Sequence, residues 1–435
     1  MKRVVLSLFL LCLAVSLSGL ALAEEDPATG TVFDLEQAIA YAEANSPQLK
    51  MAKEAMEVAK AQADQARAAL WPDLTLQAGV SSHDPSTKIN SADTKDSYQT
   101  SATLSQPLTR SLFQQHKLAK LAYQSSSLDY QQAKEDLAFN VTRSFLDVCK
   151  ANEAVAIAQE VKALAEENLN KAKAFFQAGL VVKTDVLRME LDMANARKGL
   201  LAAENNRQIA MAALKQAIGY PQEQDLSVSS PAAFPEFHFD GQTPSSLSDR
   251  YDWQKVQLGV DMAEIGVQLA KSGYLPTAYL NLNYNATDNT KITVDDGNTT
   301  ITLGIQWSLN TGQKTAAQVK EAQSSLRRAK ASQEAVHQAA TTEILQSQLN
   351  YTESQRQLEI AKLALEIAEE NSRLAEKRYE AGVGTTIEVS DAQVALEEAK
   401  YNELSARYNL YLAGIQYEKS LGRYRQEPQD QGSEK

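Results

Sequence analysis

The chain has 435 residues and a formal net charge of −12 at neutral pH. This length allows one large or two ordinary domains. A chain this acidic is a poor partner for nucleic acid, because phosphate binding needs a basic face. Gly and Pro are scarce, at 18 and 11 residues, and Ala, Gln, Glu, Lys and Leu are abundant. Such a composition favours long helices.

Residues 1–23 have the pattern of a secretory signal peptide. Lys2 and Arg3 form a charged start, the apolar run VVLSLFLLCLAVSL follows, and ALA at 21–23 is a cleavage site before Glu24. Uncleaved retention as a membrane anchor is the alternative. No other segment offers about 18 consecutive apolar residues, so no transmembrane helix is expected.

Cysteine and histidine usage gives no sign of catalysis. Only Cys149 remains after cleavage, so no intrachain disulfide is expected, and its helical surroundings predict a small buried side chain. Cys12 follows Leu11, where lipid attachment needs a small residue, so a lipoprotein is not expected. The four histidines lack metal-ligand spacing, and no phosphate-loop, nucleophile-elbow or zinc-protease motif is present. We expect no enzyme, no cofactor and no metal site.

An internal repeat organises the chain. Three pairs of segments resemble each other at an offset of about 203–204 residues: ALWPDLTLQAGV (69–80) and GYLPTAYLNLNY (273–284), FFQAGLVVKTDVL (175–187) and RYEAGVGTTIEVS (378–390), and LKQAIGY (214–220) and YEKSLGR (417–423). They predict two homologous structural repeats, residues 24–220 and 248–423. Residues 221–247, rich in Pro and Ser, are predicted to be a linker, and residues 424–435 a disordered tail.

Each repeat is predicted to contain a helix, two strands, a long helix, a break and a returning helix. The first helix spans 47–70, with Ser46 as its N-cap and Pro47 at its first position, and it ends before Pro72. Strict alternation of apolar and polar residues then predicts strands. The apolar faces of the four strands consist of Leu74, Leu76, Ala78 and Val80; Tyr98, Thr100, Ala102 and Leu104; Ala278, Leu280, Leu282 and Tyr284; and Ile301, Leu303, Ile305 and Trp307.

These strands have the length and pattern of membrane-spanning strands. Each has about 9–11 residues, and the face opposite the apolar one is rich in Asn, Gln, Ser and Thr. A soluble sheet with one solvated face is the alternative. In lipid the strands must close into a barrel, and four strands are too few. Two chains would give eight strands with a filled interior, whereas three would give twelve strands and a lumen.

The long helices predict a tube. Residues 110–177 and 313–381 contain no Pro or Gly, so each can form a helix of about 100 Å, which belongs in a coiled coil or bundle. Shorter helices placed end to end (47–70 and 184–218) would lie beside the first of them. An apolar stripe and an alanine stripe predict two different neighbours for the second: Ile360, Leu363, Ile367 and Leu374, and Ala361, Ala364, Ala368 and Ala375.

Each long helix ends in a break that is predicted to reverse the chain, far from the strands. Gly179 and Gly382 can adopt the left-handed conformation that ends a helix, and Thr184 and either Thr385 or Thr386 can cap the returning helix. Plain chain reversal is the alternative to a functional tip. It does not account for the exposed apolar residues Leu180, Val181, Val182 and Val383. Apolar residues at an exposed tip indicate docking to a partner.

The duplicated architecture, the Trp-Pro and Leu-Pro entries to the strands and the paired tips F/Y-x-A-G-x-x-x-x-x-[DE]-V resemble the TolC-like outer-membrane efflux proteins. The resemblance covers nearly the whole mature chain. It implies a mainly helical fold with a membrane β-barrel part: a homotrimer with a twelve-stranded barrel in outer-membrane lipid and a tunnel of twelve helices across the periplasm. The chain would then be a passive exit duct for efflux or type I secretion. A periplasmic structural or adaptor coiled coil is the alternative.

The resemblance also implies roles for the tips. They would meet a periplasmic adaptor that couples to an inner-membrane transporter, with cargo (a drug, a metal ion or a protein) left open. The docking residues would be Gly179, Leu180, Val181, Thr184, Gly382, Val383, Gly384 and Thr385.

The residues that line and close the periplasmic entrance in that family can be matched here. Its acidic residues match Asp185, Glu388 and Asp391, for which an ordinary solvated carboxylate at a helix start is the alternative. Its tyrosine matches Tyr379, but Gly384 replaces its arginine, so another residue must supply the cation, for which Lys183 and Arg188 are candidates.

Two tryptophans are expected at the membrane surface. Trp71 and Trp307 flank strands at the ends nearer the helices, where an interfacial aromatic belt would lie. Burial in the joint between helices and barrel is the alternative.

Overall fold

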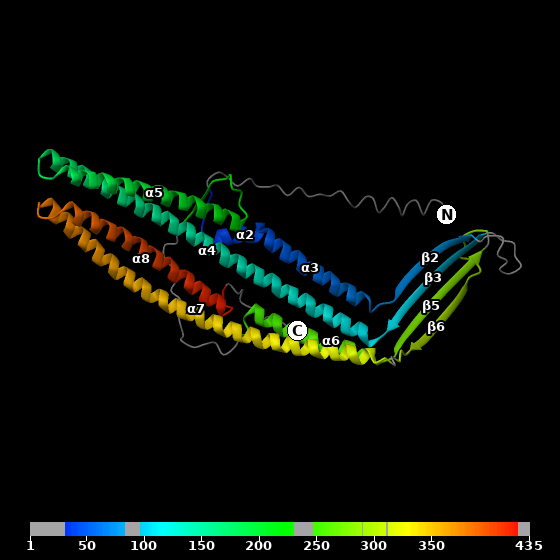
Figure 1. Ribbon diagram of the computed structural model, residues 1–435. Helices are drawn as coiled ribbons and strands as arrows, with labels where there is room; N and C mark the ends of the chain where they lie inside the picture. The colour runs from blue at the N-terminus through cyan, green and yellow to red at the C-terminus, as the bar shows by residue number, and fades with distance from the viewer. Residues whose placement is uncertain (1–30, 83–95, 230–246, 289, 310–311, 425–435) are drawn as a thin grey trace, which may run out of the picture.

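The computed structural model describes residues 31–82, 96–229, 247–288, 290–309 and 312–424. Long helices extend from a four-stranded sheet at one end to two helical tips at the other (Figure 1). In chain order the elements are β1 (Thr31–Phe33), α2 (Leu35–Asn45), α3 (Pro47–Ala68), β2 (Asp73–Ser82), β3 (Asp96–Leu108), α4 (Arg110–Gln177), α5 (Lys183–Ile218), β4 (Leu226–Val228), α6 (Tyr251–Ser272), β5 (Thr277–Asp288), β6 (Asn298–Gln306), α7 (Lys314–Glu380) and α8 (Thr386–Ser420). The predicted signal peptide lies outside the described residues.

The two structural repeats have the same plan. In each, a long helix (α4 or α7) runs from the sheet to a tip and a shorter helix (α5 or α8) returns beside it, while α3 or α6 lies along the half nearer the sheet (Figure 1). Helix α4 has the bounds predicted from the absence of Pro and Gly. Ser46 caps α3 by accepting a hydrogen bond from the Leu49 N–H at 3.4 Å, and Pro47 is its first residue, as predicted.

The sheet joins the two repeats. Its strands are antiparallel in the order β2-β3-β5-β6, and the register places Leu76, Ala102 and Tyr284 in one row. The next row has Thr75, Thr103 and Asn283, in which the Asn283 amide donates to Thr103 Oγ1 at 2.8 Å. One face is therefore apolar and the other polar and hydrogen-bonded, as the alternation predicts.

The two tryptophans near the sheet, Trp71 and Trp307, lie just outside its strands. Strand β6 ends at Gln306, so Trp307 follows the strand instead of belonging to it, and its Nε1 donates to the Tyr274 carbonyl at 3.2 Å. Trp71 lies in a bend before β2, and both tryptophans are exposed in the single chain. Neither is buried within the single chain, and their place at the membrane surface stays a prediction.

The main hydrophobic core lies in the middle of the helical part. Phe145, Leu146, Leu214 and Tyr408 from α4, α5 and α8 are almost completely buried there. Cys149 is buried among them, as predicted for a small hydrophobic residue. Packing of these helices against one another fixes the middle of the rod.

Three short elements at this core were not predicted. Strand β1 pairs in parallel with β4, and α2 packs on α4. Strand β4 lies within the predicted linker, and Leu226 is buried in the core. Tyr424, the first residue of the predicted tail, shares a 2.8 Å hydrogen bond with Thr142 and contacts the Phe139 ring. Strands β1 and β4 have only three residues each, which is too short for an alternation pattern to predict them.

An ionic cluster joins the end of α8 to the start of α6. Arg250 donates to the Ser420 carbonyl at 2.6 Å and to Glu343 at 2.7 Å, and it also pairs with Asp252. Burial raises the pKa of the nearby Glu135 to about 7. Among the described residues, one oxygen of this carboxyl is buried without a hydrogen-bond partner.

Glu135→Gln is expected to remove a pH dependence of stability. Because the pKa of Glu135 is raised in the folded state, the folded protein binds the proton more tightly than the unfolded chain. The resulting stabilisation is present below about pH 4.5 and is lost as the pH rises through about 7. The melting temperature of the wild type, measured relative to Glu135→Gln, should be lower at pH 8 than at pH 5. An unchanged difference would contradict the perturbed pKa.

None of the helices that the structure describes has the length and apolar character needed to cross a membrane. Within the same residues, no group of three or more His, Cys, Asp or Glu side chains is placed to hold a metal ion.

Candidate functional site at the helical tips

The two tips share one hydrogen-bonding pattern. Gly179 and Gly382 have φ of 74° and 72°, the left-handed conformation that favours glycine. The N–H of the residue after each glycine donates back over the last helical turn: Leu180 to the Phe175 carbonyl at 2.9 Å, and Val383 to Arg378 at 3.0 Å. This pairing ends both long helices in the same way, as predicted for the glycines.

Gly384 has a further role in the second tip. Its N–H donates to the Arg378 carbonyl at 2.9 Å, and a Cβ at this position would lie 2.8 Å from the Tyr379 backbone nitrogen. No side chain fits there without a backbone shift. The arginine that the resemblance would place at Gly384 is therefore incompatible with this turn.

Gly384→Ala is expected to loosen the second tip by roughly 1–2 kcal/mol, because the added Cβ meets backbone atoms. Limited trypsin cleavage after Arg378 should then be about 5- to 30-fold faster. The matched control is Gly199→Ala in α5, where the nearest heavy atom to the added Cβ is Glu397 Oε1 at 4.0 Å. Equal cleavage rates for both variants would contradict a special role of Gly384.

The returning helices are capped differently. Thr385 caps α8, since its side chain accepts from the Glu388 N–H at 3.2 Å. The prediction that Thr184 caps α5 is wrong: α5 begins at Lys183, the residue before the helix is Val182, and Asp185 accepts the Val182 N–H at 3.3 Å. A carboxylate in the first turn replaces the threonine cap and suits the helix dipole.

Asp185 also joins the two hairpins, of which the first is α4–α5 and the second is α7–α8. Thr386 Oγ1 donates to Asp185 Oδ1 at 2.8 Å, while Oδ2 of the same carboxylate accepts the Val182 N–H. Both carboxylate oxygens are therefore engaged, one within its own tip and one across to the other hairpin.

Ion pairs reinforce this junction. Arg188 on α5 lies 3.5 Å from Asp391 on α8. Lys171, six residues before the end of α4, donates to Glu380, the last residue of α7, at 2.8 Å. This hydrogen bond is the main cause that raises the pKa of Lys171. Both pairs connect the first hairpin to the second.

Glu388 is held within its own hairpin. Arg378, near the end of α7, lies 3.5 Å from its carboxylate. All three acids proposed for the entrance, Asp185, Glu388 and Asp391, thus have a polar or charged partner. Of the two candidate cations, Arg188 pairs with Asp391. The Nζ of Lys183 lies 5.9 Å from the centroid of the Phe176 ring.

Tyr379 is buried where the hairpins meet. Its ring centroid is 5.5 Å from that of Phe175 on α4, and Val389 and Ala392 of α8 complete this cluster. Its hydroxyl is buried without a hydrogen-bond partner among the described residues. Burial, and then the charge of Asp185, raise the pKa of this phenol. The ring secures the junction by packing.

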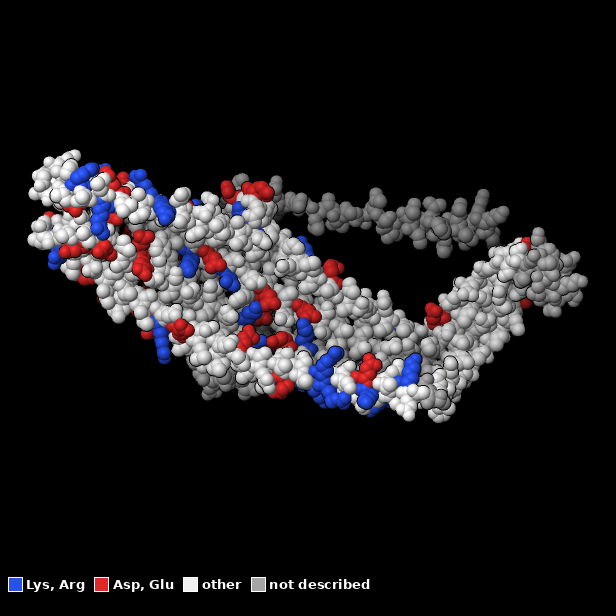
Figure 2. Space-filling model, viewed as in Figure 1, with Lys and Arg blue, Asp and Glu red and all other residues white. Residues whose placement is uncertain are grey.

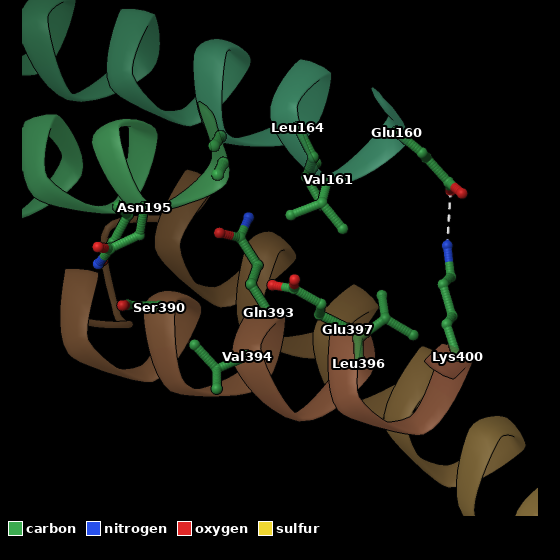
Figure 3. A pocket seen from close by; sticks show the side chains of 13 residues that line it. Glu160, Val161, Leu164, Asn195, Ser390, Gln393, Val394, Leu396, Glu397 and Lys400 are labelled. Atoms are coloured by element: carbon green, nitrogen blue, oxygen red, sulfur yellow. Dashed lines mark hydrogen bonds and ion pairs between the residues drawn. The ribbon is translucent and has the colours of Figure 1, made fainter. Parts of the chain in front are cut away.

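Behind this junction, a groove of about 200 Å³ lies between the first hairpin and α8. Figure 3 shows Val161 and Leu164 of α4 facing Gln393 and Glu397 of α8 across it. The Lys400–Glu160 ion pair, at 2.7 Å, closes one end. Burial raises the pKa of Glu397. The hairpins therefore touch at the tips and leave space behind them.

The far ends of the tips are apolar and exposed. Leu180, Val182 and Val383 are 72%, 62% and 71% exposed, whereas Val181 is only partly exposed. Figure 2 shows uncharged surface at both hairpin ends, with Lys, Arg, Asp and Glu side chains directly behind.

The sequence did not predict roles at the tips for Arg378, Lys171 and Glu380, because their contacts depend on the way the helices pair.

A model of the outer membrane efflux protein family matches residues 38–220 and 244–423, one match in each repeat. The chain therefore belongs to the outer membrane efflux protein family. It is an outer-membrane channel of an efflux or export system, with its helices in the periplasm. The family is one of channels and not of enzymes, and membership implies a tripartite system. The alternative of a periplasmic structural coiled coil is set aside.

Curated relatives agree with this assignment, and solved structures share the fold. Outer membrane protein TolC of Salmonella enteritidis is 25% identical over 414 residues, which cover 89% of this chain and 82% of that protein. The MtrE outer membrane channel of Neisseria gonorrhoeae, solved in an open state, matches with a TM-score of 0.78 and 20% identity over 90% of this chain and 91% of that one. CusC matches with a TM-score of 0.80 and 16% identity, over 89% and 91% of the two chains.

Proposed function

We propose that three copies of this chain close into one duct, a homotrimer with twelve strands in the outer membrane. The observation that carries the proposal is the open sheet, in which β2 and β6 are edge strands and one face is apolar. Open edges are not tolerated in lipid, and four strands are too few to close. Three copies pair every edge and enclose a lumen with the polar face inside.

The long helices support the same assembly. Ile360, Leu363 and Ile367 on α7 are 68%, 58% and 61% exposed, whereas Ala361 and Ala368 beside them are buried within the chain. Ala361, Ala368 and Ala375 thus meet the chain's own helices, whereas Ala364 of the predicted alanine stripe is exposed. The apolar stripe is left for a neighbouring copy. Three copies would complete a tube of twelve helical rods, each formed by a long helix or by two shorter helices end to end.

The duct is passive and is held closed at its tips. The contacts between hairpins that hold it closed are Asp185–Thr386, Arg188–Asp391, Lys171–Glu380 and the packing of Tyr379 on Phe175. A periplasmic adaptor, coupled to an inner-membrane transporter, docks on the exposed apolar ends of the tips and separates the hairpins. The docking residues are Gly179, Leu180, Val181, Thr184, Gly382, Val383, Gly384 and Thr385. Trp71 and Trp307 face the membrane surface.

The acids Asp185, Glu388 and Asp391 give the entrance its ion preference. Three copies bring nine carboxylates to one constriction, which favours cations. Planar-bilayer recordings of the purified protein should show a cation-selective channel of low conductance. Replacing all three acids by Ala should reduce the cation selectivity and the block by multivalent cations. A wild type without channels would contradict the duct, and unchanged selectivity and block in the variant would contradict the acidic entrance.

A further inference from the structure

The two hairpins correspond to each other residue by residue. A single shift of 203 positions brings Gly179 onto Gly382 and Gly219 onto Gly422, which are the described glycines with positive φ. The same shift relates the last residue of α4 to that of α7, and the first residue of α5 to that of α8. Each residue of one hairpin therefore has an equivalent at the same place in the other.

Equivalent leucines differ in burial. Leu146 of α4 and Leu404 of α8 are each 1% exposed in the core that joins the two repeats. Their equivalents are Leu349 of α7 and Leu201 of α5, which are 59% and 69% exposed. The leucines are thus buried where one repeat meets the other, and exposed where the single chain has no further repeat to cover them.

The exposed leucines belong to the two outer helices. Figure 1 shows α4 and α8 side by side, with α5 and α7 outside them. Because α7 is equivalent to α4, and α5 to α8, the contact between α4 and α8 can recur between α7 of one copy and α5 of the next. We propose that the seam between copies, meaning this line of contact, repeats the seam within the chain. The proposal rests on the ring of three copies proposed above.

The equivalences assign an ion pair to the seam between copies. Within the chain, Glu153 of α4 pairs with Arg407 of α8. Their equivalents are Arg356 of α7 and Glu204 of α5, which also have opposite charges but with the signs exchanged. Arg356 is exposed and Glu204 is partly exposed in the single chain. Arg356 therefore pairs with Glu204 of the neighbouring copy.

A second ion pair lies at the tips. Within the chain, Thr386 of α8 donates to Asp185 of α5 at 2.8 Å. The equivalent of Asp185 is Glu388, and that of Thr386 is Lys183, so a hydrogen bond within the chain corresponds to two opposite charges. Both charged residues are exposed. Glu388 therefore pairs with Lys183 of the same neighbouring copy.

The exchanged signs distinguish the two seams. If α8 of another copy replaced α5 against α7, Arg407 would lie beside Arg356. The converse error, α5 against α4, would place Glu204 beside Glu153. Like charges in contact disfavour both wrong pairings. The charges thus favour one order of hairpins around the ring.

Cross-linking between cysteines tests the seam between copies. In a Cys149→Ser background, Arg356→Cys/Glu204→Cys and Lys183→Cys/Glu388→Cys are treated with a short bismaleimide in the native membrane. The products are then separated in denaturing detergent. Each variant should shift from the mass of one chain to covalent species of two and three chains, because the linked residues belong to different copies.

Glu153→Cys/Arg407→Cys in the same background is the matched control, since these positions meet within one chain. Its cross-linked product should keep the mass of one chain. If native mass spectrometry shows three chains but neither test variant forms covalent species of two and three chains, the proposed seam is overturned while the ring stands. A particle of one or two chains would overturn the ring, and the seam with it.

Charge reversal tests the ion pair behind the tips. Arg356→Glu and Glu204→Arg should each lower the temperature at which the three chains dissociate by several degrees. The double variant should recover at least about half of the summed loss, because it restores opposite charges. Strictly additive losses would contradict the pair.

Discussion

Replacing Arg188 and Lys171 by Ala together is expected to raise the single-channel conductance of the closed duct several-fold. Arg188 pairs with Asp391 and Lys171 with Glu380, and both pairs connect the first hairpin to the second. Each is partly exposed, so each contributes only about 0.2–1 kcal/mol. Six such pairs in a trimer sum to roughly 1–6 kcal/mol, enough to shift the open population about fivefold or more.

This double variant keeps Asp185, Glu388 and Asp391, so cation selectivity should persist while conductance rises. Lys255→Ala is the matched control, since it breaks an ion pair between α6 and Asp129 of α4, away from the tips. Its conductance should equal that of the wild type. A double variant that conducts no better than Lys255→Ala would mean that these ion pairs do not hold the tips closed.

A charge on the apolar face of the sheet should have the second large effect. Leu303, in the middle of β6, is 74% exposed and shares its face with Leu280, its partner on β5. Leu303→Arg places a guanidinium in lipid at a cost of about 2–4 kcal/mol per chain. In a trimer the cost is threefold, and folded protein in the outer membrane should fall to a small fraction of the wild-type amount.

Thr302→Arg provides the control for this substitution. Thr302 is the preceding residue on the same strand, faces the other side of the sheet and is paired with Asn281. Its charge would enter the water-filled lumen, so the protein should still reach the membrane and should conduct cations less well. Similar membrane levels for the two variants would show that neither face of the sheet meets lipid.

Regular, repetitive parts of the fold could be predicted from sequence. The stretch 110–177 lacks Pro and Gly, and it is helical throughout because nothing in it breaks the backbone hydrogen bonds. Alternation along the strands predicts their two faces, since successive side chains point to opposite sides. Gly179 and Gly382 mark the turns, because a left-handed residue after a helix favours glycine.

Contacts between distant segments could not be predicted in this way. The bond from Thr386 to Asp185 spans 201 positions and depends on how two hairpins pack. Thr184 resembles a helix cap in sequence, but Asp185 takes that role because its carboxylate reaches the Val182 N–H. Gly384 occupies the position of an expected arginine, and only the folded turn shows that a side chain there would meet the backbone.

The mass of the native protein extracted from the outer membrane tests the central claim most directly. Native mass spectrometry in mild detergent gives the number of chains without assumptions about shape. The open sheet and the exposed stripe on α7 predict three mature chains in the particle. A monomer or dimer recovered from the membrane fraction would contradict a twelve-stranded barrel shared among three copies, and with it the duct whose tips are closed by the Asp185 and Arg188 contacts.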